Sequence, residues 1–162
     1  MLKLRHRKRL RRKEALGFIQ SLKNDLGIEI ANADEPIESA DADGWKLLII
    51  KGKILAIIVN DRPFLSVRGL LTCKPKKQFV TVDMGAVKFV CNGADVMAPG
   101  IVDADQTISE GDLVWIRDER NKQPLAIGQA LISGAEMIES RSGKAIKTLH
   151  FVGDKIWKLD EE

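Results

Sequence analysis

The chain is poor in the residues that hold metals and form cross-links. It has two cysteines, Cys73 and Cys91, and two histidines, His6 and His150, which lie near opposite ends. No pair of these residues has the spacing of a zinc site, and two cysteines in 162 residues do not make a disulfide scaffold. We therefore expect no metal and a reduced protein of the cytoplasm.

Motifs of catalysis and of membrane insertion are also missing. The longest apolar run, Leu47–Ile50, has the length of a strand, far below the roughly 18 residues of a membrane span. The basic N-terminus lacks the apolar segment that follows in a secretory signal. There is no nucleophile elbow, phosphate-binding loop, dinucleotide fingerprint or HExxH motif. These absences predict a protein that is not an enzyme, binds no cofactor and has no membrane partner.

What the sequence does have is positive charge concentrated at one end. Eight of the 26 basic residues lie within residues 3–13, with no acid among them, whereas the other 18 stand against 23 acidic residues. Such a block is typical of an arm that binds nucleic acid through phosphates, although a targeting signal or a solvated tail has the same composition. The candidate RNA-binding residues of this arm are Arg5, Arg7, Lys8, Arg9, Arg11 and Arg12.

The first half of the chain predicts a small α+β domain with an antiparallel sheet, residues 1–75. Apolar spacing favours a helix from Leu4 to Leu26, with the basic run in its first turns or as a frayed arm before it. Residues 32–44 are acidic and predict an exposed loop, and residues 45–59 predict a hairpin. The sequence Lys74-Pro75-Lys76-Lys77 predicts a domain boundary.

The second half is organised around residues 79–101. Residues 79–82 predict a strand, Asp83 can cap a following helix of about two turns, and Asn92-Gly93 predicts its end. Lys88 and Asn92 fall on the polar side of this helix, where they could hold a phosphate or a ribose edge, or simply face solvent. After residues 102–107, expected as a loop, apolar segments between tight turns predict five or six strands in a small barrel or sandwich.

A series of motifs in the second half is specific enough to indicate a family. The motifs are Val82-Asp83-x-Gly85-Ala86, Gly93-Ala94-Asp95, Pro99-Gly100-Ile101 and Glu110-Gly111-Asp112-x-Val114, followed by Gly128 and Ala130. On these motifs residues 78–159 resemble a PUA domain, the RNA-binding module named after pseudouridine synthases and archaeosine transglycosylases. The resemblance implies a pseudo-barrel of about six strands with short helices.

Further motifs extend the resemblance over the whole chain. They are Arg62-Pro63-Phe64, Arg68-Gly69-Leu70-Leu71, residues 85–90, residues 92–100 and His150-Phe151-x-x-Asp154-x-x-Trp157. They resemble the family of the malignant T-cell amplified sequence protein and its archaeal relatives, which pair an α+β pre-PUA domain with a PUA domain. The resemblance implies action on the small ribosomal subunit and on initiator tRNA, and eukaryotic members bind the density-regulated protein. The basic run is not part of the eukaryotic pattern, and it favours RNA binding.

The resemblance also implies where RNA lies on this chain. In PUA domains RNA typically follows the first helix, its preceding turn and the facing strands, which here points to Gly85, Ala86, Lys88, Asn92 and Gly93. Lys147 and Lys158 are expected on neighbouring strands. The glycines could instead serve backbone geometry, and the lysines could simply be solvated charges. Trp115 and Trp157 could stack bases or belong to the barrel core.

From these observations we expect an RNA-binding protein that contacts tRNA or the rRNA of the small ribosomal subunit in initiation, reinitiation or recycling. A separate translation factor is a further expected partner. Two alternatives use the same features. Residues 1–75 could dock a factor, which would make the protein an adaptor, or the chain could be a targeting subunit for an RNA-modifying enzyme.

Overall fold

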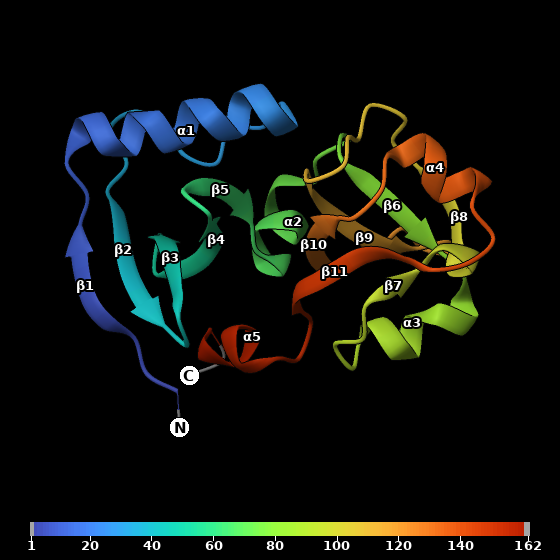
Figure 1. Cartoon of the computed structure of the whole chain (residues 1–162). Helices are drawn as coiled ribbons and strands as arrows, with labels where there is room; N and C mark the ends of the chain where they lie inside the picture. The colour runs from blue at the N-terminus through green and yellow to red at the C-terminus, as the bar shows by residue number, and fades with distance from the viewer. Residues whose placement is uncertain (1, 161–162) are drawn as a thin grey trace. The chain divides into compact units, whose positions relative to one another are not determined.

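The computed structural model describes residues 2–160, which form two compact units. The first unit combines the chain up to Lys76 with the C-terminal helix, and the second comprises Lys77–Asp154. Each unit is organised around its own sheet (Figure 1). The predicted α+β class is confirmed, with an antiparallel N-terminal sheet followed by a curled sheet of six strands.

Five antiparallel strands make the first sheet and neighbour one another in the order of the sequence. They are β1 (Arg5–Arg9), β2 (Ile37–Ala42), β3 (Trp45–Ile50), β4 (Lys53–Val59) and β5 (Arg62–Leu65). The predicted hairpin at residues 45–59 is confirmed as β3 and β4. Because residues 47–50 are all buried, the centre of the sheet is covered on both faces.

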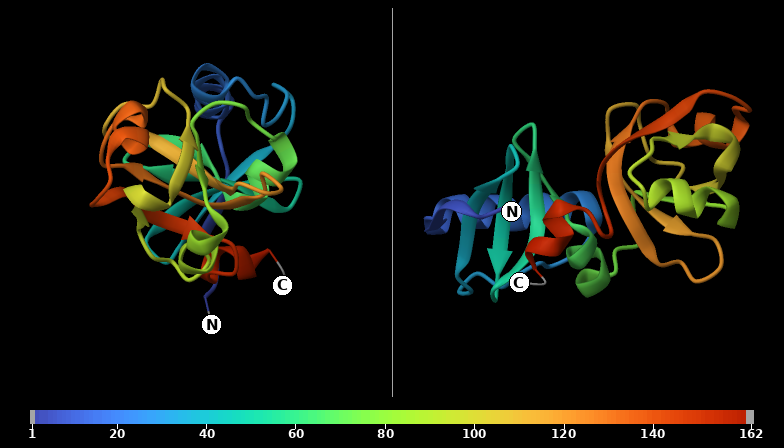
Figure 2. Two further views of the ribbon diagram at one scale, coloured as in Figure 1. Left: turned by 90° about the vertical axis from the view of Figure 1, so that its right-hand side faces the viewer. Right: turned by 90° about the horizontal axis from the view of Figure 1, so that it is seen from below.

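Three helices pack on this sheet, namely α1 (Arg12–Leu26), α2 (Val67–Cys73) and α5 (Lys155–Leu159). Helix α1 crosses the strands on one side of the sheet and α5 lies on the other (Figure 1 and Figure 2). Leu22 and Leu26 hold α1 in place because both are fully buried. Gly27 adopts a left-handed conformation and ends the helix where the sequence predicts its end.

The C-terminal helix belongs to the first unit, whereas the predicted second domain, residues 78–159, includes it. Asp160 follows α5 and accepts a hydrogen bond from the Ile54 N–H at 2.9 Å. Its carboxylate also lies 3.1 Å from Nε of Arg68, whose guanidinium stacks 3.9 Å above the ring of Trp157. These contacts hold α5 and Asp160 against β4 and α2.

Two local predictions in this unit are wrong. Residues 5–9 form strand β1 rather than helix or a frayed arm, because basic side chains oppose the positive end of a helix dipole while β2 offers a partner strand. Residues 37–42, expected inside an exposed loop, form β2. Ile37, Ala40 and Ala42 of this strand are buried, and its acidic side chains pair with β1.

Six strands make the sheet of the second unit, and they curl into a half-barrel (Figure 1). They are β6 (Phe79–Val82), β7 (Val96–Met97), β8 (Ile101–Ala104), β9 (Leu113–Asp118), β10 (Pro124–Ala130) and β11 (Lys144–Phe151). The spatial order is β7-β11-β10-β9-β6-β8, and only the β6–β9 pair is parallel among the described strands. Residues 102–104, expected as a loop, belong to the edge strand β8, which pairs with β6.

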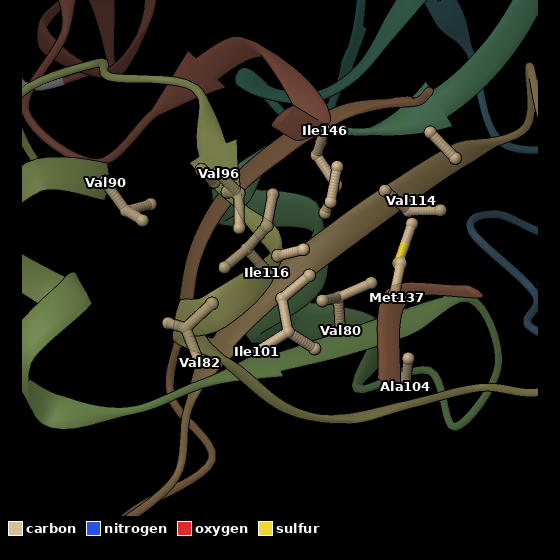
Figure 3. Close-up of a cluster of buried hydrophobic side chains, with 14 of the residues drawn as sticks. Val80, Val82, Val90, Val96, Ile101, Ala104, Val114, Ile116, Met137 and Ile146 are labelled. Carbon is tan, nitrogen blue, oxygen red and sulfur yellow. The ribbon is translucent and has the colours of Figure 1, made fainter. Parts of the chain in front are cut away.

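The half-barrel encloses an apolar core that also receives side chains from its short helices. These are α3 (Met84–Val90), the 3-10 turn η1 (Ala98–Gly100) and α4 (Gly134–Glu139). Figure 3 shows Val90 of α3 and Val96 of β7 directed into the core with Ile116 and Ile146 of the sheet. Because Val90 and Val96 are each only 2% exposed, the core holds α3 and β7 on the same flank of the barrel.

Candidate nucleic-acid interface

Helix α3 is capped at its start by two carboxylates and is followed by a glycine turn. Asp83 caps its start, since Oδ1 accepts a hydrogen bond from the Ala86 N–H at 2.8 Å, as the sequence predicts. The Met84 N–H donates to Oε2 of Glu119 at 3.1 Å, which satisfies a second free donor of the first turn. Beyond the helix, Gly93 has φ +86° and makes the turn that leads to β7. The helix and the strand therefore form two walls of fixed position.

A groove of about 710 Å³ lies between these walls. It is lined by Asp83, Gly85, Ala86, Phe89, Val90, Ala94, Asp95, Val96, Met97, Pro99, Gly100 and Lys144. Two predicted site residues, Gly85 and Ala86, are among them. Ala86 packs closely on Gly100 of η1. A Cβ added at Gly100 would stand only 3.1 Å from the Cβ of Ala86. Small residues thus let a ligand approach the backbone of α3.

Two large apolar side chains of the groove lining are exposed. Phe89 is 56% exposed and Met97 is 46% exposed, so together they give the groove an accessible apolar surface. Nζ of Lys88 lies 5.2 Å from the centre of the Phe89 ring, so the cation stands beside an aromatic face. Sequence reasoning missed Phe89, although one signal was present: it is an apolar residue beside the stripe formed by Val87 and Val90.

One ion pair stands in the groove wall opposite α3. Nζ of Lys144 lies 3.3 Å from Oδ2 of Asp95, and the Thr148 N–H donates to Oδ1 of Asp95 at 3.0 Å. Lys144 reaches this place because β11 pairs with β7, with Lys144 opposite Met97. Neither Asp95 nor Lys144 was predicted as a site residue, since strand pairing brings them together across about 50 residues of sequence.

Asn92 and Gly93 have structural roles instead of lining the groove. The Asn92 side-chain amide donates to the carbonyl of Lys88 at 2.9 Å and so caps the end of α3. A Cβ added at Gly93 would stand 2.6 Å from Cε1 of Phe151, which leaves no space for a side chain. Lys88 is exposed at the end of the helix, and its predicted contact with RNA remains a prediction.

The two remaining lysines of the predicted PUA site belong to different units. Lys147 is exposed on β11, opposite Gln129 of β10, as expected for a neighbouring strand. The expectation of a strand at Lys158 is wrong. This residue lies on α5, in the first unit, because Asp160 and Trp157 anchor that segment as a helix against Arg68.

The basic arm forms the exposed edge of the first sheet. All five side chains of β1 are exposed, and two of them have acidic partners on β2. Arg7 donates two hydrogen bonds to Glu38, at 2.9 and 3.0 Å, and Nδ1 of His6 lies 3.0 Å from Oδ2 of Asp41. These hydrogen bonds lower the pKa of Glu38 and raise that of Arg7. Arg7 is therefore engaged in an ion pair that links β1 to β2.

The other candidates in the arm are open to a ligand. Arg12 stands 3.6 Å from Asp34 in a pair that is largely exposed on both sides. Within the described residues, no ion pair involves the four basic side chains that remain, those of Arg5, Lys8, Arg9 and Arg11. Because they are exposed and unneutralised, these four are the arm residues best suited to phosphate contacts.

The described residues offer little to a metal or to nucleophilic chemistry. They contain no group of three or more His, Cys, Asp or Glu side chains that could hold a metal ion. Burial raises the pKa of both cysteine thiols, which disfavours the reactive thiolate. Trp115 is 4% exposed and its indole N–H donates to the carbonyl of Lys77 at 2.7 Å, so it packs instead of stacking on a ligand. No helix in the described part of the chain is long and apolar enough to cross a membrane.

Comparisons with known proteins agree with the two-unit architecture. The PUA domain family matches residues 78–152. An uncharacterized protein of Methanocaldococcus jannaschii is 44% identical over 147 residues, which cover 87% of this chain and 91% of the relative. Translation machinery-associated protein 20 of Saccharomyces cerevisiae is 34% identical over 74% of this chain and 70% of its own length.

Two further similarities extend this result. The malignant T-cell-amplified sequence 1 homolog of Drosophila melanogaster is 36% identical over 61% of this chain and 57% of its own length. The crystal structure of a hypothetical protein of Pyrococcus horikoshii superposes with a TM-score of 0.86 and 36% identity. It covers 95% of this chain and 99% of the solved chain, so the similarity includes both units and not the PUA domain alone.

Proposed function

Since the chain belongs to the family of translation machinery-associated protein 20 and malignant T-cell-amplified sequence 1, we propose that it binds RNA of the translation machinery. Its RNA partners are tRNA and the small ribosomal subunit, in initiation, reinitiation or recycling. The protein acts by binding and positioning RNA in the cytoplasm, and no bond is made or broken.

The groove between α3 and β7 is the observation that carries this proposal. An exposed aromatic ring, Phe89, stands beside a backbone made accessible by Gly85 and Ala86. Unpaired bases stack on such rings, whereas the bases of a closed duplex cannot reach them. The groove therefore suits one or two nucleotides of a loop or of a single-stranded end.

The second contribution comes from the basic arm. Arg5, Lys8, Arg9 and Arg11 present four cations that can neutralise phosphates of a duplex or of a folded RNA. Such contacts position an RNA without reading its sequence. On this proposal Arg7 and Arg12 support the arm, and Lys88, Lys147 and Lys158 add peripheral positive charge.

The direct test measures binding of the full chain to a tRNA transcript and its co-sedimentation with small ribosomal subunits. The matched variant replaces Arg5, Lys8, Arg9 and Arg11 by Gln and Phe89 by Ala, which removes both contributions while leaving the buried residues intact. We expect binding to both ligands for the natural chain and loss of both in the variant. Binding that survives these five substitutions would contradict the proposal.

Nuclease treatment separates this function from that of an adaptor. Small subunits or factors that remain attached after the RNA is digested would be held through protein contacts. In that case residues 1–75 would act as a docking domain, and the role of the groove in RNA binding would have no support.

A further inference from the structure

We propose that Asp95 and Lys144 recognise the 2′-hydroxyl of a ribonucleotide seated in the groove, so that this groove selects RNA over DNA. The inference rests on the proposed function, because it takes the groove to be the seat of an unpaired nucleotide.

The charge of the groove determines which part of a nucleotide enters it. Three of its twelve lining residues are ionisable, namely Asp83, Asp95 and Lys144, which together carry one net negative charge at neutral pH. A phosphate inside the groove would meet two carboxylates and one ammonium group. The neutral base and sugar are therefore favoured inside, and the phosphates are favoured outside, where Lys88 is exposed.

Only one of the two carboxylates is suited to a ligand. Asp83 is engaged in capping α3 through Oδ1. Asp95 is oriented by the Thr148 N–H, which donates to Oδ1, while Oδ2 lies 3.3 Å from Nζ of Lys144. The side chain of Asp95 is 29% exposed and that of Lys144 is 62% exposed, so a ligand can reach both. The pair offers a fixed acceptor next to an adjustable donor.

A hydroxyl group complements this pair better than any other part of the sugar. It donates one hydrogen bond and accepts others, so one 2′-hydroxyl can donate to Asp95 and accept from Lys144 at the same time. Deoxyribose has no group that does either at this position, and the 2′-hydroxyl is what distinguishes RNA from DNA at a given site. With the sugar at this wall, the base is free to stack on Phe89 of the α3 wall.

The test uses three RNA hairpins that share one stem and one four-nucleotide unpaired 3′ tail. The tail sugars are ribose in the first, 2′-deoxyribose in the second and 2′-fluororibose in the third. The fluorine keeps the ring pucker of ribose but cannot donate a hydrogen bond, and the shared stem keeps phosphate contacts constant. We expect the natural chain to bind the ribose tail about tenfold more tightly than either other tail, as for a hydrogen bond to a charged group.

Two variants assign this preference to the pair. Asp95→Asn keeps an oxygen for the Thr148 N–H but removes the carboxylate, and it should bind all three tails with the affinity of the deoxyribose tail. Lys144→Met should reduce the preference without changing affinity for the deoxyribose tail. Glu139→Gln is the matched control for charge, because Glu139 is exposed on α4 and outside the groove, and it should leave the preference intact.

The outcomes separate this inference from the function beneath it. Failure of the natural chain to bind any of the hairpins would overturn both. Equal binding of the three tails, full binding of the 2′-fluoro tail, or an unchanged preference in Asp95→Asn would overturn the inference alone. The inference would also be overturned if changing the bases of the ribose tail lowered the affinity to that of the deoxyribose tail, since Asp95 would then read a base edge.

Discussion

The two candidate RNA contacts of this protein differ in almost every physical property. The arm is an exposed sheet edge: all five side chains of β1 are exposed, and unneutralised cations stand at Arg5, Lys8 and Arg9 of the strand and at Arg11 just after it. The groove beside α3 is concave, apolar for most of its lining, and slightly negative. One surface can attract any polyanion from a distance, whereas the other accepts only a group of suitable shape.

This difference indicates a division of labour. Contacts with phosphates release counterions, so their contribution falls steeply as salt rises. Stacking on Phe89 and hydrogen bonds inside the groove involve no such release and depend on whether a nucleotide is unpaired. The arm should therefore supply affinity and its salt dependence, and the groove should supply selectivity for the form of the RNA.

The largest expected effect comes from the arm. Replacing Arg5, Lys8, Arg9 and Arg11 together by Gln should weaken tRNA binding about 100-fold near physiological salt. The slope of log affinity against log salt should become shallower by about 3, because each phosphate that is no longer neutralised removes about 0.7–0.9 from the slope. Fluorescence anisotropy across a salt series measures both quantities.

The control for the arm is a second quadruple variant of equal charge. Lys46, Lys53, Lys74 and Lys76 are exposed in the same unit but lie outside β1, and their replacement by Gln should change the slope much less. An equal fall in slope for the two variants would mean that net charge, and not the arm, drives binding.

A smaller effect of a different kind is expected in the groove. Phe89→Ala should weaken binding to a hairpin with an unpaired tail by about tenfold, in the lower part of the range for loss of one stacked base. The salt slope should stay unchanged, because no charge is removed. Val102→Ala is a suitable control, since Val102 is also exposed in this unit but lies on β8, away from the groove. A changed slope in Phe89→Ala would remove the distinction between the two surfaces.

A variant at Asn92 tests whether this residue, which lies outside the groove lining, contacts RNA. Because its amide hydrogen bond goes to the carbonyl of Lys88, Asn92→Ala should lower the free energy of unfolding by about 0.5 kcal/mol and leave RNA affinity unchanged. Thermal unfolding and the same binding assay measure the two effects. Loss of RNA affinity with unchanged stability would place Asn92 among the residues that contact RNA.

The smallest expected effect is the acid sensitivity of the arm. The hydrogen bonds from Arg7 hold the pKa of Glu38 below its ordinary value, so the pair stabilises the fold above about pH 4.3, the ordinary pKa of a glutamate. This stability is lost as the pH falls through the lowered pKa of Glu38. Glu38→Gln should therefore be less stable at pH 7, by less than about 1 kcal/mol for an exposed pair.

Stability curves measured by urea denaturation at pH 7 and at a pH below the lowered pKa of Glu38 check this expectation. The difference between Glu38→Gln and the natural chain should vanish at the lower pH. A difference that persists in acid would show that packing, and not the ion pair, holds β1 on the sheet.

The features that could be predicted from the sequence are those fixed within a few residues. Asp83, Gly27 and the turn between β3 and β4 determine local structure, and all three lie where the pattern places them. The residue pattern itself predicted a domain boundary at Lys74–Lys77. Motif resemblance supplied the barrel of the second domain, which periodicity alone left open between a barrel and a sandwich. Gly85 and Ala86 came from the same motifs and line the groove.

The features that were missed depend on contacts between distant residues. Strand β1 forms because Glu38 and Asp41 lie opposite its basic side chains, more than 30 residues away. Lys144 enters the groove through its pairing with Met97. α5 is anchored on the first unit by Asp160, whose partners Ile54 and Arg68 lie about 100 residues earlier. No local pattern contains this information.

The central claim is that unpaired nucleotides occupy the groove while phosphates contact the arm. The most direct measurement places 4-thiouridine in the unpaired tail of a tRNA-like hairpin, crosslinks it to the full chain by irradiation and maps the attached peptide by mass spectrometry. With each variant saturated by RNA, we predict crosslinks within residues 84–100 that weaken in Phe89→Ala and persist when the four arm residues are replaced by Gln. Tail crosslinks within residues 3–13 that disappear on replacing the arm residues would contradict the account.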